Sequence, residues 1–222
     1  MAVKVITVGE KILGTNDAKA EENKKLLVRH GILTVNIMSS PGAGKTSLIL
    51  STIKRLSKKA RIAVIEGDVA SSVDADKVNA LGIPVVQINT AGGCHLDAFM
   101  VEKGLHNLPL EKVDLLFIEN VGNLICPNNY KLGEDIRLMI ASMPEGDDKP
   151  YKYPAMFADT EVVVLNKTDL QPYIDFDEKA FRKVVIGLNP DVIIFPVSCK
   201  TGEGMPAWFD WLEAALKNKK NK

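Results

Sequence analysis

Short apolar runs alternate with longer segments of helical periodicity along most of this chain. The apolar runs contain few polar residues, and we predict strands at residues 32–38, 61–65, 84–88, 114–118, 160–165 and 192–197. Apolar positions at helical spacing predict helices at residues 16–30, 44–59, 71–81, after His95 and around 208–216. Strands that are apolar on both faces are typical of a parallel sheet with helices on both sides. The pattern therefore predicts a single doubly wound α/β domain.

Two segments stand apart from this alternation. Residues 16–30 run into Gly31, which is a typical helix stop. We therefore expect residues 1–30 to form an N-terminal helical extension and residues 31–222 to form the main domain. Residues 144–154 are rich in Pro, Gly and Asp and lack a clear period, so we expect a mobile excursion from the fold there.

Composition and charge narrow the classes of partner. The 222 residues include 28 Lys and Arg against 28 Asp and Glu, so the formal net charge is zero. This balance gives no indication of binding to nucleic acid or to an anionic membrane. No apolar run approaches the roughly 20 residues that span a bilayer, and the first residues lack the apolar block of a signal peptide. We expect a cytoplasmic protein whose three cysteines stay reduced.

A phosphate-binding loop follows the first predicted strand. Residues 39–46 read Ser-Ser-Pro-Gly-Ala-Gly-Lys-Thr and open a predicted helix, although Ser39 replaces the usual first glycine of this motif. Such a loop binds phosphates through its backbone N–H groups and the helix N-terminus. We expect Lys45 to reach the β- and γ-phosphates and the Thr46 hydroxyl to bind magnesium. The predicted nucleotide-binding residues of this loop are Gly42, Ala43, Gly44, Lys45, Thr46 and Ser47. The motif favours a three-layer P-loop NTPase fold.

Acidic residues follow two further predicted strands. Glu-Gly-Asp (66–68) comes after one strand and Glu-Asn-Val-Gly (119–122) after another. Ligands of open α/β sheets bind at the carboxyl ends of the strands, so both segments should face the phosphate loop. We predict Asp68 as the magnesium acid and Glu119 as a second acid, with Lys45 completing the catalytic set. The Gly122 N–H is a candidate sensor of the γ-phosphate.

A guanine-reading motif follows the strand at residues 160–165. In Asn166-Lys167-Thr168-Asp169, the Asp169 carboxylate can accept hydrogen bonds from the ring N–H and the exocyclic amine of guanine. Adenine has no matching pair of donors and would leave buried groups unpaired. Ser198-Cys199-Lys200 ends the last strand, where a loop can close over the base. These two segments predict GTP rather than ATP as the nucleotide.

A second chemistry is indicated by Cys94, His95 and Cys126, which lie on two loops at the same edge of the predicted sheet. Thiolate and imidazole groups suit nickel and zinc. Spacing alone leaves an alternative open, in which these residues are a buried cysteine and a polar loop histidine. We interpret Cys199 instead as a core or base-loop residue.

A set of motifs together resembles the hydrogenase nickel-incorporation GTPases, the HypB family of SIMIBI-class P-loop GTPases. The resemblance covers residues 30–215. The motifs are Ser-Ser-Pro-Gly-Ala-Gly-Lys-Thr (39–46), Glu-Gly-Asp (66–68), Val-Gln-Ile-Asn-Thr (86–90), Cys-His-Leu-Asp-Ala (94–98), Ile-Glu-Asn-Val-Gly-Asn-Leu-Ile-Cys-Pro (118–127), Asp-Asp-Lys-Pro (147–150), Lys-Tyr-Pro-Ala-Met-Phe (152–157) and Asn-Lys-Thr-Asp (166–169).

The resemblance implies a dimerising GTPase that helps to deliver nickel to the large subunit of [NiFe] hydrogenase, with a nickel-insertion partner of the HypA type. It also implies that Cys94, His95 and Cys126 form the metal site of the GTPase domain. Two features depart from the family pattern. Residues 1–30 contain no cysteine and only one histidine, His30, and Ser71 stands where many members have threonine. Tight nickel storage by the N-terminus is therefore not expected.

Three other hypotheses remain open from the sequence. The urease accessory GTPase belongs to the same superfamily, but its metal motif reads Cys-Pro-His and this chain has Cys94-His95 without the proline. A metal store or sensor would bind GTP without turning it over. In a signalling or translation-type GTPase, Cys94 and Cys126 would be incidental.

Overall fold

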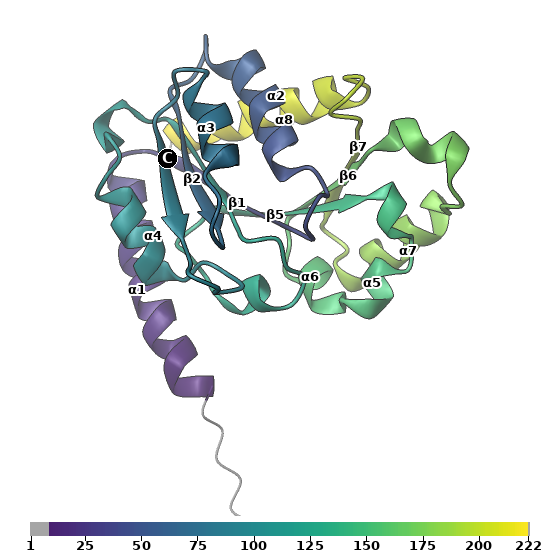
Figure 1. Cartoon of the computed structure of the whole chain (residues 1–222), viewed down its shortest axis with the longest axis horizontal. Coiled ribbons are helices and arrows are strands. Elements are labelled where there is room, and N and C mark those ends of the chain that lie inside the picture. The colour runs from purple at the N-terminus through teal and green to yellow at the C-terminus, as the bar shows by residue number, and fades with distance from the viewer. Residues whose placement is uncertain (1–8, 222) are drawn as a thin grey trace, which may run out of the picture.

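A parallel sheet of seven strands forms the centre of the molecule, in the order β3-β2-β4-β1-β5-β6-β7 (Figure 1). The computed structural model describes residues 9–221, with side chains from residue 13 onward. The strands are β1 (Leu33–Ser39), β2 (Ile62–Asp68), β3 (Val85–Asn89), β4 (Leu115–Glu119), β5 (Ile136–Ser142), β6 (Val162–Asn166) and β7 (Ile193–Pro196). Residues 1–8 of the predicted N-terminal extension lie outside the described residues.

Helices cover both faces of this sheet, which confirms the predicted three-layer P-loop fold. Helices α2 (Lys45–Leu56), α3 (Val73–Asn79) and α8 (Met205–Lys220) pack on one face. The opposite face is covered by α1 (Gly9–Arg29), α4 (Ala98–Leu105), α6 (Pro154–Ala158) and α7 (Glu178–Leu188) (Figure 1). The five inner strands, β2, β4, β1, β5 and β6, are almost entirely buried between these layers, which explains their continuous apolar sequences.

Strand β1 lies at the middle of the sheet, between β4 and β5. All strand pairs are parallel, so the loops that leave the carboxyl ends of the strands gather at one edge. The register of β2 and β4 places Glu66 directly beside Glu119. Both acids are the last or nearly last residues of their strands, whereas the sequence pattern placed them just after the strands.

Strand β5 and helix α7 were not predicted from the sequence. The sequence pattern does not predict strand β5, because Arg137 interrupts its apolar run. In the structure, the Arg137 side chain is almost buried beside Glu134. Helix α7 has a short apolar stripe in which only Phe181 and Val185 are buried. Its N-terminus is capped by Asp177, whose carboxylate accepts a hydrogen bond from the Ala180 N–H.

The segment at residues 144–154 has more regular structure than expected. It contains the 3-10 turn η3 (Met143–Glu145) and the short helix α5 (Lys149–Lys152), and it leads into α6. Ser142 and Glu145 form a capping box at η3. Pro150 and Pro154 occupy first-turn positions, where the absent N–H group costs nothing. In this segment, prolines that interrupt the periodic pattern of the sequence lie in the first turns of helices.

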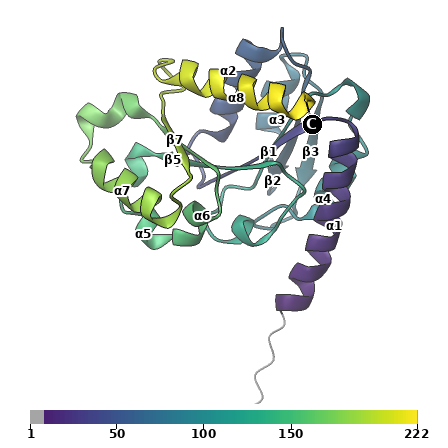
Figure 2. The same ribbon diagram turned by 180° about the vertical axis from the view of Figure 1, so that it is seen from behind.

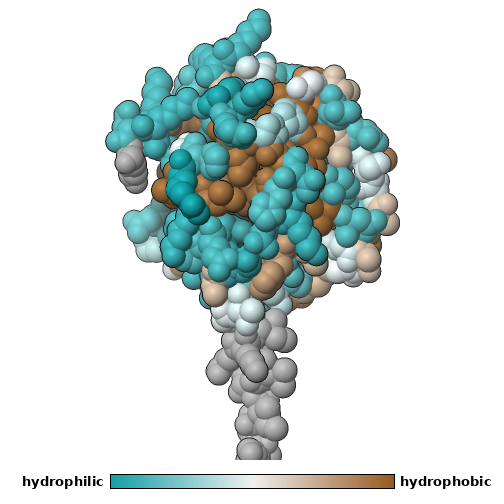
Figure 3. All heavy atoms as spheres, turned by 90° about the vertical axis from the view of Figure 1, so that its left-hand side faces the viewer, coloured by the Kyte–Doolittle hydropathy of each residue, from teal (hydrophilic) through white to brown (hydrophobic). Residues whose placement is uncertain are grey.

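Helix α1 packs along α4 and its first turns project beyond the rest of the molecule (Figures 1 and 2). The Asn23 side chain donates to the carbonyls of Ala98 and Leu132, at 2.8 and 3.1 Å. Figure 3 looks onto this side of the molecule and shows an apolar area framed by hydrophilic residues. The nearby edge strand β3 has only partly buried residues before its exposed last position. Within residues 9–221, no helix has the length and apolar content needed to cross a membrane.

Candidate nucleotide and metal site

The phosphate loop joins β1 to α2 at the carboxyl edge of the sheet. Gly42 and Gly44 have positive φ angles of 75° and 112°, a conformation that side-chain-bearing residues rarely adopt. A Cβ atom on Gly44 would lie 2.3 Å from the Asn166 Nδ2 atom. Gly122 also approaches this loop, because a Cβ atom there would lie 3.0 Å from the backbone of Pro41. Glycine is therefore required where the loop meets its two neighbours.

Lys45 and Thr46 point toward a buried carboxylate at the end of β4. The Thr46 hydroxyl donates to Glu119 Oε1 at 2.9 Å. Lys45 Nζ lies 4.0 Å from the same oxygen and 3.4 Å from the Ser39 hydroxyl. Burial raises the pKa of Glu119, and the charge of Lys45 partly opposes that rise. The side chains expected to bind phosphate and magnesium thus share one acidic partner.

Three carboxylates gather beside Thr46. Oxygens of Glu66, Asp74 and Glu119 lie within 4.8 Å of one another. Burial and the nearby charge of Glu119 raise the pKa of Glu66 to about 10. Within the described part of the chain, the buried Oε2 atoms of Glu66 and Glu119 have no hydrogen-bond partner. Buried carboxylate oxygens without donors, next to a threonine hydroxyl, fit the oxygen ligands that magnesium prefers.

Asp68, which the sequence suggested as the magnesium acid, is not among these three carboxylates. Its Oδ1 atom accepts hydrogen bonds from the backbone N–H groups of Ala70 and Ser71, both at 2.9 Å. These bonds lower the pKa of Asp68, and Lys45 lowers it further through a weaker Coulomb interaction. The carboxylate therefore organises the loop after β2 in this structure.

A base pocket of about 350 Å³ lies on the other side of the phosphate loop. Its lining includes Gly42, Gly44, Ser47, Asn166, Lys167, Asp169, Leu170, Cys199 and Lys200. Asn166 connects two walls of the pocket. The Asn166 Nδ2 donates to the Ala43 carbonyl at 2.9 Å, and the Asn166 Oδ1 accepts from the Cys199 N–H at 3.2 Å. Lys167 Nζ donates to the Gly42 carbonyl at 2.7 Å. The structure thus brings together the two segments predicted to read the base.

Asp169 is held by a hydroxyl from the last loop. The Ser198 hydroxyl donates to Asp169 Oδ1 at 2.6 Å and accepts from the Thr201 N–H at 3.1 Å. This leaves the second carboxylate oxygen available at the pocket. The bond fixes the rotamer of the side chain that must meet two donors of guanine, which is how a fixed acceptor gives base selectivity.

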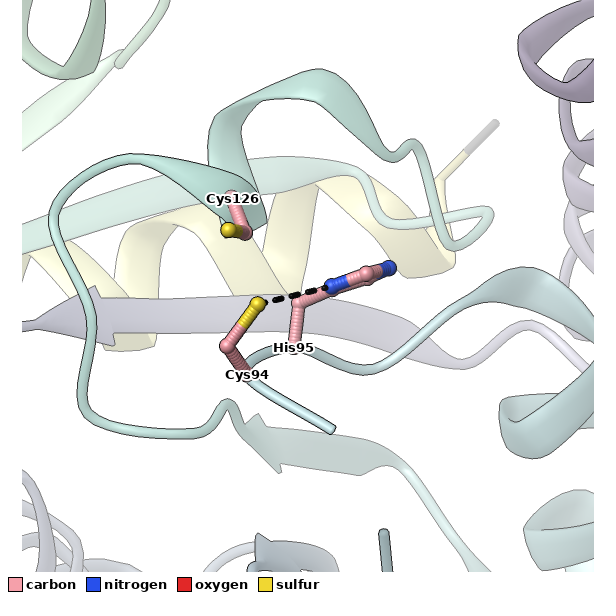
Figure 4. A group of neighbouring side chains, drawn as sticks. All are labelled: Cys94, His95 and Cys126. Carbon is pink, nitrogen blue, oxygen red and sulfur yellow. Dashed lines mark hydrogen bonds between the residues drawn. The ribbon is translucent and has the colours of Figure 1, made fainter. Parts of the chain in front are cut away.

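Cys94, His95 and Cys126 converge on one point at the same edge (Figure 4). The two sulfur atoms and an imidazole nitrogen all lie within 4.8 Å of one another, and Cys94 Sγ is 3.6 Å from His95 Nδ1. The His95 ring stacks on Tyr130, with ring centroids 3.9 Å apart. Residues from two separate loops thus supply a set of two sulfurs and one nitrogen, which suits nickel or zinc.

The surroundings favour the neutral forms of the Cys94 thiol and the His95 imidazole. A hydrogen bond with Cys126 raises the pKa of the Cys94 thiol, and the loss of some surrounding water raises it further. Burial lowers the pKa of His95. A metal cation would displace the thiol protons and favour thiolates, so binding is expected to release protons.

Asn123 connects the cluster to the phosphate loop. Its backbone N–H donates to the Ser39 carbonyl at 2.8 Å, and its side-chain Nδ2 donates to the Cys94 carbonyl at 3.2 Å. Glu66 and Asn123 were not chosen from the sequence as site residues. The motif Glu-Gly-Asp contained Glu66, but only the strand register shows that Glu66 faces Glu119.

Known proteins resemble this chain in sequence and in architecture. Residues 33–196 match the family model described as CobW/HypB/UreG, nucleotide-binding domain. The chain is 46% identical to the hydrogenase maturation factor HypB of Azotobacter vinelandii, over 95% of this chain and 69% of that protein. The crystal structure of HypB from Helicobacter pylori in complex with nickel superposes with a TM-score of 0.88 at 36% identity, covering 93% of this chain and 97% of that one. The HypB structure from Archaeoglobus fulgidus gives a TM-score of 0.86 at 38% identity, with 91% and 99% covered.

Proposed function

Because the chain belongs to the HypB family of hydrogenase maturation factors, we propose that it is a GTP-hydrolysing metallochaperone that delivers nickel during the maturation of [NiFe] hydrogenase. Residues 31–222 form its GTPase domain and residues 1–30 an N-terminal extension. It acts as a homodimer with a HypA-type nickel-insertion protein, and the hydrogenase large subunit receives the metal.

The base pocket and the cluster of three carboxylates beside the phosphate loop support the nucleotide chemistry. Asp169, held by Ser198, selects guanine, while Lys45 binds the terminal phosphates in place of its present contact with Glu119. Thr46, Asp68 and the Glu66–Glu119 pair hold magnesium, directly or through water. Magnesium supplies charge neutralisation for phosphoryl transfer. We expect the acids at these strand ends also to orient an attacking water.

Nickel is the cargo and binds to Cys94, His95 and Cys126, and zinc competes for the same ligands. The observation that carries the proposal is the position of Asn123, which bonds both to the strand leading into the phosphate loop and to the Cys94 carbonyl. A change in residues 119–123 on loss of the γ-phosphate therefore reaches both sides of the metal cluster. This is switching of a loop segment by nucleotide.

Cells that depend on this chain for hydrogenase maturation provide the test. We expect His95→Ala and Cys126→Ala to abolish hydrogenase activity while the purified variants still release phosphate from GTP. The matched control is His106→Ala, which removes an exposed histidine at the end of α4 and should leave both activities intact. Normal hydrogenase activity in the Cys126→Ala cells would contradict nickel delivery through this cluster. Absence of GTP turnover by the wild-type protein together with its partner would instead favour a metal store.

A further inference from the structure

A buried polar network crosses the sheet face beneath the Cys94–His95–Cys126 cluster. The face that carries α1 and α4 has one apolar core, and the part that carries α6 and α7 has another. Between these cores lies Asn36 of β1, which is fully buried. Residues 120–135, which connect β4 to β5, cover this seam in place of a long helix.

The first arm of the network reaches the loop that carries Cys94 and His95. Asn120 is fully buried, and its Nδ2 donates to Asn36 Oδ1 at 3.3 Å. Its Oδ1 accepts from the Leu96 N–H at 3.0 Å and from the Val121 N–H at 2.9 Å. Leu96 directly follows His95, so one asparagine fixes the end of this metal-ligand loop to the central strand.

The second arm reaches the turn η2 (Cys126–Asn129), which carries the third ligand. Asn36 Nδ2 donates to Glu134 Oε1 at 3.1 Å, and the same oxygen lies 3.3 Å from Arg137 Nε. Arg137 Nη2 donates to the backbone carbonyls of Asn128 at 2.8 Å and Pro127 at 3.4 Å. One guanidinium thus holds two carbonyls that closely follow Cys126.

We propose that Asn36, Asn120, Glu134 and Arg137, here termed the seam network, are positioning residues that hold the two metal-ligand loops at binding distance from each other. Both arms start at one residue of the central strand, which is rigid because it pairs with β4 and β5. Burying amides and an ion pair is expensive, and apolar residues can often replace such a pair at no cost to stability. A positional role explains why polar groups occupy this seam.

The network is expected to act on metal affinity through preorganisation. Groups that orient metal ligands typically change affinity by roughly 10- to 100-fold when they are removed. Arg137→Lys keeps a positive charge beside Glu134, but a single ammonium lacks the fork that reaches Glu134 and the two carbonyls together. We expect nickel to bind this variant about tenfold more weakly than the wild type, at the lower end of that range.

The test titrates nickel into the purified full chain and follows the thiolate-to-nickel charge-transfer absorption. The matched control is Arg61→Lys. That guanidinium bonds both oxygens of Asp114 and the Glu111 carbonyl, at the opposite edge of the sheet. Arg137→Lys should weaken nickel binding and shift the absorption band, with GDP affinity within about twofold of wild type. Arg61→Lys should change none of these. Wild-type nickel affinity and an unchanged band in a folded Arg137→Lys variant would overturn the proposal.

A second variant tests the same network if Arg137→Lys does not fold. Glu134→Gln keeps the acceptor for Asn36 but removes the charge next to Arg137, and it should also weaken nickel binding. Because the residues act as one network, the double variant should bind nickel no more weakly than Arg137→Lys alone. Additive losses would contradict a shared network. The inference rests on the proposed metal site, and the two fail differently: nickel binding that survives Cys126→Ala would refute the site itself, whatever the behaviour of Arg137.

Discussion

Gly44→Ala tests whether the phosphate loop and the base motif are built as one unit. Gly44 has a φ angle of 112°, and its Cα faces the Asn166 amide so closely that a Cβ would lie 2.3 Å from Nδ2. Asn166 has to move away to accommodate the methyl group. It would then give up its bonds to the Ala43 carbonyl and the Cys199 N–H.

The magnitude follows from these contacts. Strain at a positive φ costs a side-chain-bearing residue roughly 1–2 kcal/mol. The two hydrogen bonds of Asn166 contribute about 1 kcal/mol each, so Gly44→Ala should lower the free energy of unfolding by about 3–4 kcal/mol. Gly82→Ala is the matched control, because Gly82 has a φ of 73° and nothing within 4 Å of its added Cβ. Only the strain applies there, so the two variants should differ by about 2 kcal/mol, or roughly 4–8 °C in Tm.

Thermal and urea unfolding of both variants gives the measurement, with GDP affinity as a second readout. Repeating Gly44→Ala in an Asn166→Ala background isolates the contact, since the smaller side chain leaves room for the methyl group. The excess cost of Gly44→Ala over Gly82→Ala should disappear there. Equal destabilisation by the two glycine variants in the wild-type background, or an excess that persists without the Asn166 amide, would refute the reasoning.

Three further variants test other parts of the site and fold. Lys45→Ala should abolish GTP binding yet leave nickel affinity nearly intact, and loss of both in calorimetry would argue against separate sites. Ser198→Ala should weaken GDP binding about tenfold by freeing Asp169, equivalent to about 1.4 kcal/mol; unchanged affinity would contradict that role. Arg61 holds the pKa of Asp114 well below its usual range, so the stabilisation is present above the unfolded pKa and is lost as pH falls. Asp114→Asn should therefore cost about 1 kcal/mol in urea unfolding at pH 7 and progressively less below about pH 4, and an equal cost at pH 7 and pH 3 would contradict this.

Much of the fold was predictable because the strands are buried on both faces. Their apolar runs are visible without knowledge of neighbours, and the glycine-rich loop follows the first of them. Strand β5 was not predictable in this way, because Arg137 is explained only by the seam network. The short helices after η3 have prolines in their first turns, and read alone these prolines indicate a break.

The candidate site was predictable to the extent that its residues lie in continuous motifs. Lys45, Asp169 and the Cys94–His95 pair could be singled out in this way. The role of Glu66 depends on which residue of β2 lies beside Glu119, the partner of Thr46, and that is fixed by the register of β2 against β4. Asn123 owes its importance to two long-range bonds, which no local pattern reveals.

The most direct test of the central claim is calorimetric titration of nickel into the purified chain, first with GDP and magnesium and then with a non-hydrolysable GTP analogue. A nucleotide-gated nickel carrier predicts that nickel affinity or stoichiometry differs between the two states, and that binding at this site disappears in Cys126→Ala. Identical nickel binding in both nucleotide states would contradict coupling through residues 119–126.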